Sequence, residues 1–341
     1  MKSLPYTSKL ILALLCMNLL MPFELMTATG SLSESTVPTM VQVKPVPPLN
    51  RSNEFIATPL ISTPVSLQSF TVNVIQQLSV QKPFASWKDA ELQYFPLGPG
   101  TRSWLVIVSE NQKKDLGYLI LSAKDDGSNP NESYILSEYG AAPSIPYNLT
   151  MLRQNLVQLG IIPTTFPSSI NVEALYVPLL PLWRITSDTN EPIYMNALTL
   201  EVLPWGDSHF KSLSDKAIWT KEGIPSSDHN LKSSTPVSYK GEVNPYNNLL
   251  WVTAPEVPLS TNQEFTSYLK SQSSLIFTAP NRNDDYGSPF NITGFQEWST
   301  KHQDSQDYLY VGTGLNGNRY LPLSLLRTQG EFRASPQIKG L

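Results

Sequence analysis

Two short tripeptides place a hydroxyl, a carboxylate and an imidazole together, the groups that a serine hydrolase combines. The first, DSH, spans 207–209, and the second, SDH, spans 227–229. A serine hydrolase needs its base held against the hydroxyl by a third group, and no G-x-S-x-G turn occurs in the sequence. We therefore expect His209, His229 and His302, the only histidines, to be surface residues in loops. We predict no catalytic residue.

Oxygen-rich loops are the places where the chain comes nearest to a metal site. Residues 281–287 read NRNDDYG and alternate oxygen-bearing side chains, but the glycine comes one position late and Ile292 stands where a closing acid is needed. Asp125, Asp126 and Glu132 form a second acidic loop without ligand spacing. Zinc needs paired His or Cys ligands, which the sequence does not offer. We predict solvated loops, no metal and no cofactor.

The amino terminus has the parts of a secretory signal. Lys2 and Lys9 supply positive charge, Leu10–Phe23 is apolar, and the small residues Ala and Gly follow within 28–30. The apolar run is shorter than the roughly 20 residues that span a bilayer. We predict that residues 1–30 are a cleaved signal peptide and that the protein is secreted. Retention of this segment as a membrane anchor is the alternative.

Cysteine content and charge exclude several classes of function. Cys16 is the only cysteine and lies inside the predicted signal peptide, so the mature chain can form no disulfide and has no thiolate nucleophile. The 341 residues carry a formal charge of −4 without a basic patch, which argues against a nucleic-acid partner. Stability must therefore come from an ordinary apolar core.

Residues 104–140 are the centre of the predicted fold, because they contain three apolar runs separated by polar turns. Before them, residues 64–78 carry apolar side chains at three- and four-residue spacing, which predicts a helix capped by Thr63 or Ser66 that lies on the sheet. Adjacent antiparallel strands are predicted at Leu92–Phe95, Trp104–Ser109, Gly117–Ala123 and Ser133–Gly140.

The rest of the chain adds shorter elements. Thr150 is predicted to cap a helix at Met151–Leu159. Ala174–Thr186 and Pro192–Leu203 flank a polar turn and are predicted to be the two strands of a hairpin. Beyond them the sequence predicts helices near Phe210–Ile218 and at Thr261–Gln272, and strands at Leu275–Thr278, Asp307–Val311 and Arg319–Pro322.

Composition divides this pattern into regions. We predict an α+β protein in which an antiparallel sheet is packed with helices, followed by a second, smaller α/β-like module. The predicted regions are a signal peptide at 1–30, a Ser/Thr/Pro-rich linker at 31–64, the α+β domain at 65–205, a linker at 206–247, and the C-terminal module at 248–341.

The first ordered region is similar to a known family. The pattern F-x-x-W-K-x-A-x-L is formed by Phe84, Trp87, Lys88, Ala90 and Leu92, and the strands GYLILSA and SYILSEYG follow it. This order resembles the cystatin-like, PepSY-related propeptide region of secreted bacterial cysteine peptidases of the streptopain type. The resemblance implies a cystatin-like or PepSY-like fold and a role in binding a peptidase.

Two later segments extend the resemblance. The hairpin at 174–203 extends it to about residue 205, and the tail at 319–332 adds a second similarity. PepSY-like modules often end in two strands whose pattern is matched here at Trp183, Tyr194, Asn196, Ala197, Thr199 and Glu201, with Leu200 in place of the usual glycine. The tail RYLPLSLLRTQGEF at 319–332 is similar to that of secreted proteins with a C39-like peptidase half. The cysteine and histidine of that half map to no residue here, so the resemblance implies a missing or degenerate catalytic half.

Aromatic side chains recur on the predicted strands, among them Trp104, Tyr118, Trp183 and Tyr194. A stacking surface for a sugar or peptide is one interpretation, but packing in the core is the commoner fate of such residues and is our expectation. Glycosylation sequons occur at Asn50, Asn131, Asn148 and Asn291 and carry little weight.

The functional hypothesis is a secreted, non-enzymatic binding or interaction protein that is propeptide-like or protease-inhibitor-like. Its partner would be a secreted protease or another extracellular protein, which the sheet edge could bind by strand addition. Contact with a membrane is expected only through an uncleaved signal segment. Two alternatives remain open: a secreted hydrolase with a Ser/His/Asp site in the C-terminal module, and a cell-envelope structural protein associated with the wall.

Overall fold

The structure is a computed structural model, and the residues that it describes all belong to one compact unit, Leu49–Leu341. The predicted signal peptide with Cys16, and nearly all of the predicted linker at 31–64, lie outside the described residues. The described ranges are 62–98, 102–111, 114–124, 133–143, 145–163, 170–187, 190–216, 222–228, 230–241, 244–279, 289–300, 307–314 and 318–335.

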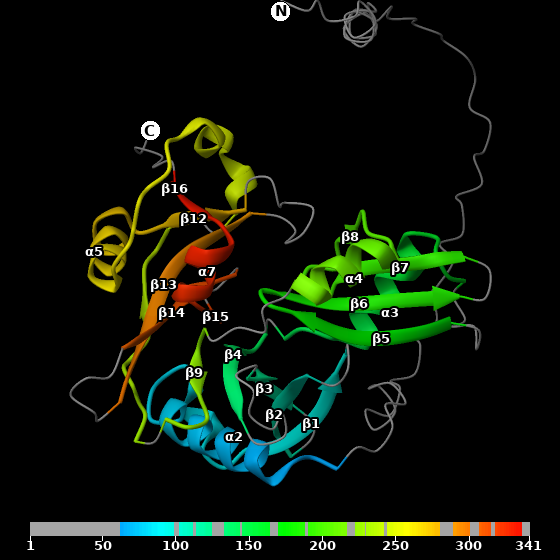
Figure 1. Ribbon diagram of the computed structural model, residues 1–341, viewed down its shortest axis with the longest axis horizontal. Coiled ribbons are helices and arrows are strands. Elements are labelled where there is room, and N and C mark those ends of the chain that lie inside the picture. Colours follow the sequence, from blue (N-terminus) through cyan, green and yellow to red (C-terminus); the bar gives the residue numbers. More distant parts are fainter. Residues whose placement is uncertain are drawn as a thin grey trace, which may run out of the picture. The chain divides into compact units, whose positions relative to one another are not determined.

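The first ordered region is an antiparallel meander with one helix packed on it, as predicted (Figure 1). The helix α2 (Val65–Leu78) buries every third or fourth residue, from Leu67 to Leu78, against the sheet. Its N-cap is Pro64, which has no side-chain oxygen, so the predicted capping by Thr63 or Ser66 is wrong. The 3-10 helix η3 (Phe84–Trp87) leads into β1 (Glu91–Leu97), β2 (Ser103–Glu110), β3 (Lys114–Ala123) and β4 (Tyr134–Ala141).

The C-terminal region repeats the order of a helix followed by four neighbouring strands. α5 (Asn262–Gln272) begins at Thr261, whose hydroxyl and the side chain of Glu264 form a reciprocal capping box. The strands are β12 (Leu275–Thr278), β13 (Phe290–Ser299), β14 (Tyr308–Thr313) and β15 (Arg319–Pro322). Their neighbours pair antiparallel, so the α/β-like arrangement predicted for this module is wrong and the region is also α+β.

One sheet runs through both ordered regions, in the order β1-β2-β3-β4-β15-β14-β13-β12-β16. The two regions join where Tyr139 of β4 pairs with Tyr320 of β15. The predicted linker at 206–247 contributes β9 (Ile224–Pro225), which pairs with β4, and β10 (Lys232–Ser233) and β11 (Val237–Ser238), which pair with β13. The division of the chain into separate domains stays a prediction, but the described strands of both regions share this sheet.

A second sheet has the order β5-β6-β7-β8. The sequence predicts one strand at Ala174–Thr186, and this is wrong because the chain reverses at Leu179, which has φ of +72°. Apolar residues on both sides of the turn conceal it, and Pro178 is the sequence signal that marks it. The strands are β5 (Ile170–Val177), β6 (Leu180–Ser187), β7 (Asn190–Asn196) and β8 (Val202–Leu203).

Two helices cover the second sheet. α3 (Leu149–Gln158) buries Leu152 and Leu156 against it, and its cap is Asn148, which accepts from the Met151 amide, rather than the predicted Thr150. α4 (Asp207–Lys216) packs Leu213 on the other face, which confirms the short helix predicted near residue 210. Among the described helices, none is both long and apolar enough to cross a membrane.

The core forms separate clusters on the two faces of the large sheet. On one face α2 packs against Trp104, Tyr139 and neighbouring side chains of the central strands. On the other face the second sheet covers Leu105, Ile107 and their neighbours on β1–β3. On this second face, α5 and α7 (Leu323–Gln329) cover the C-terminal strands. Both faces of β4 are therefore covered, which explains why all eight of its residues are buried.

Candidate functional site

The residues of the first Ser/His/Asp tripeptide do not form a catalytic triad. Asp207 accepts hydrogen bonds from the Tyr194 hydroxyl at 2.7 Å and from Nε and Nη2 of Arg184, each at 3.2 Å. The bond from Tyr194, and then those from Arg184, lower the pKa of Asp207. The ring of His209 instead lies 5.1 Å from that of Trp205. The aspartate thus links α4 to the second sheet and does not orient the imidazole.

The second tripeptide is only partly described. Asp228 accepts a hydrogen bond from the Tyr308 hydroxyl at 2.9 Å, while His229 and His302 lie outside the described residues. The predicted loops at 281–287 and 125–132 also lie outside them. Within the ranges that are described, no three His, Cys, Asp or Glu side chains gather in a metal-binding group.

The aromatic residues that could form a stacking surface are in the core, as predicted. Trp104, Tyr118, Trp183 and Tyr194 are each 3% exposed or less, so they offer no face to a sugar or peptide. Of the described sequons, Asn291 is buried in β13, which excludes a glycan on the folded chain, and Asn148 caps α3.

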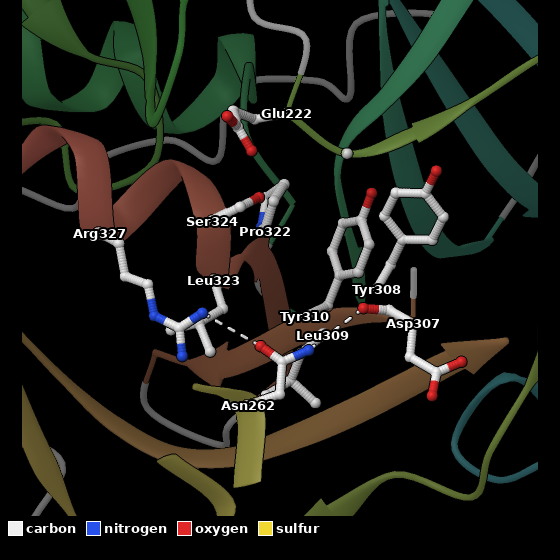
Figure 2. Close-up of a pocket in the computed structure, with 11 residues that line it drawn as sticks. Glu222, Asn262, Asp307, Tyr308, Leu309, Tyr310, Pro322, Leu323, Ser324 and Arg327 are labelled. Carbon is white, nitrogen blue, oxygen red and sulfur yellow. Dashed lines mark hydrogen bonds between the residues drawn. The ribbon is translucent and has the colours of Figure 1, made fainter. Parts of the chain in front are cut away.

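A small polar cavity lies where α7, the start of α5 and the strand β14 meet (Figure 2). Its volume is about 130 Å³. A polar cavity of this size can hold several water molecules. The lining is mostly polar and comprises Glu222, Gly223, Asn262, Asp307, Tyr308, Leu309, Tyr310, Pro322, Leu323, Ser324 and Arg327.

Arg327 is the cation of this cavity, and two of its three nitrogens are fixed by the protein. Nε donates to the Leu259 carbonyl at 2.8 Å, and Nη1 donates to Oδ1 of Asn262 at 3.1 Å. Asn262 in turn donates from Nδ2 to the Asp307 carbonyl at 3.2 Å. Nη2 is buried and has no hydrogen-bond acceptor among the described residues. The guanidinium is therefore held in one orientation with an unused donor.

The electrostatics of Arg327 follow from this position. Burial lowers the pKa of its guanidinium, and the nearby charge of Glu264 acts in the opposite direction. No described carboxylate lies within ion-pair distance of it. Figure 2 shows the carboxylate of Glu222 on the far side of Ser324, and that of Asp307 directed away from the other lining side chains. The lining thus combines an oriented cation with the acids Glu222 and Asp307.

The densest group of buried polar side chains lies at the junction of the two halves of the large sheet. Glu138 of β4 is fully buried and pairs with Arg319 of β15 at 2.8 Å. Tyr118 and Tyr176 donate their hydroxyls to the same carboxylate at 2.8 and 3.4 Å. Arg319 also donates to the Leu179 carbonyl in the β5–β6 turn at 2.8 Å. This network ties both sheets together and is almost entirely shielded from solvent, so its role is structural.

The most exposed apolar group is a ridge formed by Tyr246, Leu249, Leu250 and Val252, which we name the apolar ridge. These side chains are 54–69% exposed, and they are four of the ten large apolar side chains that are exposed in the described ranges. They lie on two consecutive 3-10 helices, η4 (Pro245–Asn247) and η5 (Leu249–Thr253).

The backbone beneath the apolar ridge is fixed. Asn244 and Asn248 cap the two 3-10 helices by accepting from backbone amides at 3.0 and 3.1 Å. Trp251 is buried and donates from its indole to the Pro245 carbonyl at 2.8 Å. Arg333 of β16 (Glu331–Ala334) donates to the Ala254 carbonyl at 2.6 Å. The ridge therefore presents its apolar side chains on a rigid support.

Sequence reasoning did not identify either the cavity or the apolar ridge. In the sequence the ridge is only a short apolar run at 249–252. The helix α7 was not predicted, although Gly330 follows it and Arg327 occupies its last turn, both signals of a helix end. Comparison of the chain with protein-family models, with curated proteins and with solved structures gives no match in any of the three.

Proposed function

We propose that the protein is an extracellular, non-enzymatic binding protein that contacts a protein partner through the apolar ridge, in the manner of a propeptide or protease inhibitor. The observation that carries the proposal is that four exposed apolar side chains lie on two consecutive 3-10 helices with a rigid support. Groups of exposed apolar side chains mark interaction sites, whereas apolar side chains that are exposed singly are ordinary.

Energetics support the same assignment. Leu249 and Leu250 are 58% and 69% exposed. A leucine that becomes fully buried contributes about 1.5–3 kcal/mol, so each of these leucines has about 1–2 kcal/mol left to gain from a partner. Because the caps and the Trp251 anchor fix the backbone beforehand, little conformational entropy is lost on binding.

The partner class rests on the resemblance to propeptides of secreted cysteine peptidases. Two residues of the motifs that carry this resemblance, Trp87 and Gly117, are in contact. The Trp87 indole donates to the Leu116 carbonyl at 3.3 Å, and its ring lies over Gly117, which is consistent with the resemblance. A helix followed by an antiparallel meander is also compatible with a cystatin-like or PepSY-like fold. Secretion and the peptidase partner remain parts of the proposal.

The test is binding to, and inhibition of, the purified secreted peptidases of the source organism. We expect a complex with at least one of them, measured by surface plasmon resonance, and about tenfold weaker binding for the double variant Leu249→Ser and Leu250→Ser. Val65→Ser with Val80→Ser is the matched control, because these valines are 77% and 70% exposed but lie outside the ridge.

Two outcomes would count against the proposal. Failure to bind any secreted peptidase would eliminate the inhibitor-like role. Binding that the leucine variants do not weaken would place the contact elsewhere. The hydrolase alternative predicts turnover of ester or peptide substrates by the purified chain, and the envelope alternative predicts that the protein stays in the cell-wall fraction.

A further inference from the structure

Several backbone amides of the apolar ridge already donate to acceptors within the protein. Those of Tyr246 and Leu250 donate to the side chains of the two capping asparagines. The amide of Ala254, just after η5, donates to the Trp251 carbonyl at 3.0 Å. Pro255 follows and has no amide hydrogen. A partner that reads a peptide through its backbone donors would therefore have to break these bonds first.

Carbonyls of the same segment are also engaged. The Trp251 indole donates to the Pro245 carbonyl at 2.8 Å. Nη1 of Arg333 donates to the Val252 carbonyl at 3.3 Å and to the Ala254 carbonyl at 2.6 Å. Drawing the segment out into an extended strand would break these bonds and expose the buried indole, so the folded ridge presents side chains to a partner.

The geometry of η5 decides which of these side chains a partner can reach. A 3-10 helix has three residues per turn, so side chains three positions apart lie on the same side. Leu249 and Val252 share one outward side, Leu250 and Thr253 share the second, and Trp251 occupies the buried third side. Residues 244–255 contain no charged side chain. The matching surface is therefore apolar and uncharged, and a chain with a formal charge of −4 is poorly suited to an anionic lipid surface.

We propose that the apolar ridge binds an uncharged apolar groove of a secreted cysteine peptidase outside its substrate-binding cleft. The inference rests on the proposed function, which supplies the peptidase. A cleft that takes extended chains cannot take a 3-10 helix without unwinding it, whereas a groove accepts helical side chains as they stand. The complex leaves the cleft open to short substrates, and any inhibition is restricted to substrates too large to pass the bound chain.

The experiment is surface plasmon resonance of the full mature chain on purified secreted cysteine peptidases of the source organism. Each peptidase is measured before and after a peptidyl chloromethylketone has alkylated its catalytic cysteine and filled its cleft. We expect the two dissociation constants to agree within about twofold. Turnover of a short fluorogenic peptide by the untreated peptidase should be unchanged when the chain is bound at saturation.

A variant that loosens the ridge without changing its exposed side chains separates the two modes of binding. Asn248→Ala removes the acceptor that caps η5, and we expect about fivefold weaker binding because the side chains are no longer held in place. Asn148→Ala is the matched control, because it removes a cap of the same kind from α3, outside the ridge. Equal or tighter binding by Asn248→Ala would show that the partner takes the segment unwound, and the proposal would be wrong.

The remaining outcomes distinguish this inference from the proposed function. Loss of binding once the cleft is filled would overturn the inference and leave the proposed function standing. Failure to bind any peptidase, treated or untreated, would overturn both. Sedimentation of the wild-type chain with phosphatidylcholine vesicles, abolished by Leu249→Ser with Leu250→Ser, would assign the ridge to a lipid surface and would also overturn both.

Discussion

Replacing Glu138 by glutamine tests whether the buried ion pair holds the two halves of the sheet together. The substitution keeps the side-chain shape and one of the two oxygens, so only one of the hydroxyls of Tyr118 and Tyr176, which donate to different oxygens, keeps its acceptor. It removes the negative charge that faces Arg319 at 2.8 Å. The arginine would then stay buried, with the Leu179 carbonyl as its main partner.

The expected cost is large because the pair is almost completely buried. Glu138 is 0% exposed and the Arg319 side chain 8% exposed, so solvent cannot replace the lost partner. Breaking a buried pair by removing one charge costs about 3–5 kcal/mol, because the other charge remains uncompensated. We expect Glu138→Gln to lower the free energy of unfolding by that amount, and Arg319→Met to have a similar effect.

The double variant separates the pair from its surroundings. If the two charges interact, removing both should cost clearly less than the sum of the single substitutions, by about 1–3 kcal/mol. Some cost must remain, because the Leu179 carbonyl and the two tyrosine hydroxyls would lose their charged partners.

Urea unfolding at pH 7, followed by circular dichroism, provides the measurement, with the slope m compared between variants. Arg184→Met is the matched control, because Arg184 pairs with Glu173 at 2.9 Å and with Asp207 at 3.2 Å, where the arginine is 26% exposed and the two acids are 42% and 56% exposed. Pairs this accessible contribute about 0–1 kcal/mol each. A loss below about 1 kcal/mol for Glu138→Gln, or strict additivity in the double variant, would refute this reasoning.

Three further changes test other parts of the fold. Gly117→Ala should destabilise the protein by about 1–3 kcal/mol, since the new Cβ would lie 2.2 Å from the Trp87 ring, whereas Gly206→Ala, with open space around it, should be nearly neutral in the same urea assay. Thr261→Ala should cost about 1 kcal/mol by removing the capping hydroxyl of α5, and Thr261→Ser should restore it; equal stability of both variants would contradict the capping role. Burial raises the pKa of Tyr320 from 10.0 to about 12, so the stability that its neutral form provides is complete below pH 10 and is lost between pH 10 and 12. Urea midpoints measured from pH 8 to 12 should therefore fall less steeply for Tyr320→Phe than for the wild-type chain.

The sequence predicts elements well where the apolar period and the end signals agree. α2 follows from apolar residues at three- and four-residue spacing, and the helix predicted at Thr261–Gln272 is confirmed as α5, whose start Thr261 and Glu264 cap. The strands β2–β4 follow from β-forming runs bounded by polar turns. Agreement between local signals is enough in these segments, because each element lies in its preferred conformation.

Prediction fails where a residue takes its role from a distant partner. Glu138 stands in an apolar strand, and nothing nearby indicates that Arg319, 181 residues later, neutralises it. The β5–β6 turn is hidden by apolar residues on both sides, because the turn is buried against the larger sheet. The cavity likewise depends on Asn262 and Arg327, which are 65 residues apart. Contacts between residues so far apart in the chain produce no periodic pattern in a single sequence.

The topology decides which surface of a propeptide-like sheet is available to a partner. In the described part of the chain, β4 cannot accept an added strand, because β15 pairs with it. The strand β1 is at one end of the described strand order and pairs with β2 along one of its edges. Addition of a partner strand to its other edge is limited by Pro96 and by the bridge between Gly98 and Leu175 of β5. The apolar ridge packs near β16, at the opposite end of the strand order. A partner that recognises this protein by burying apolar surface therefore has its best contact at the ridge, and the leucine variants test that surface directly.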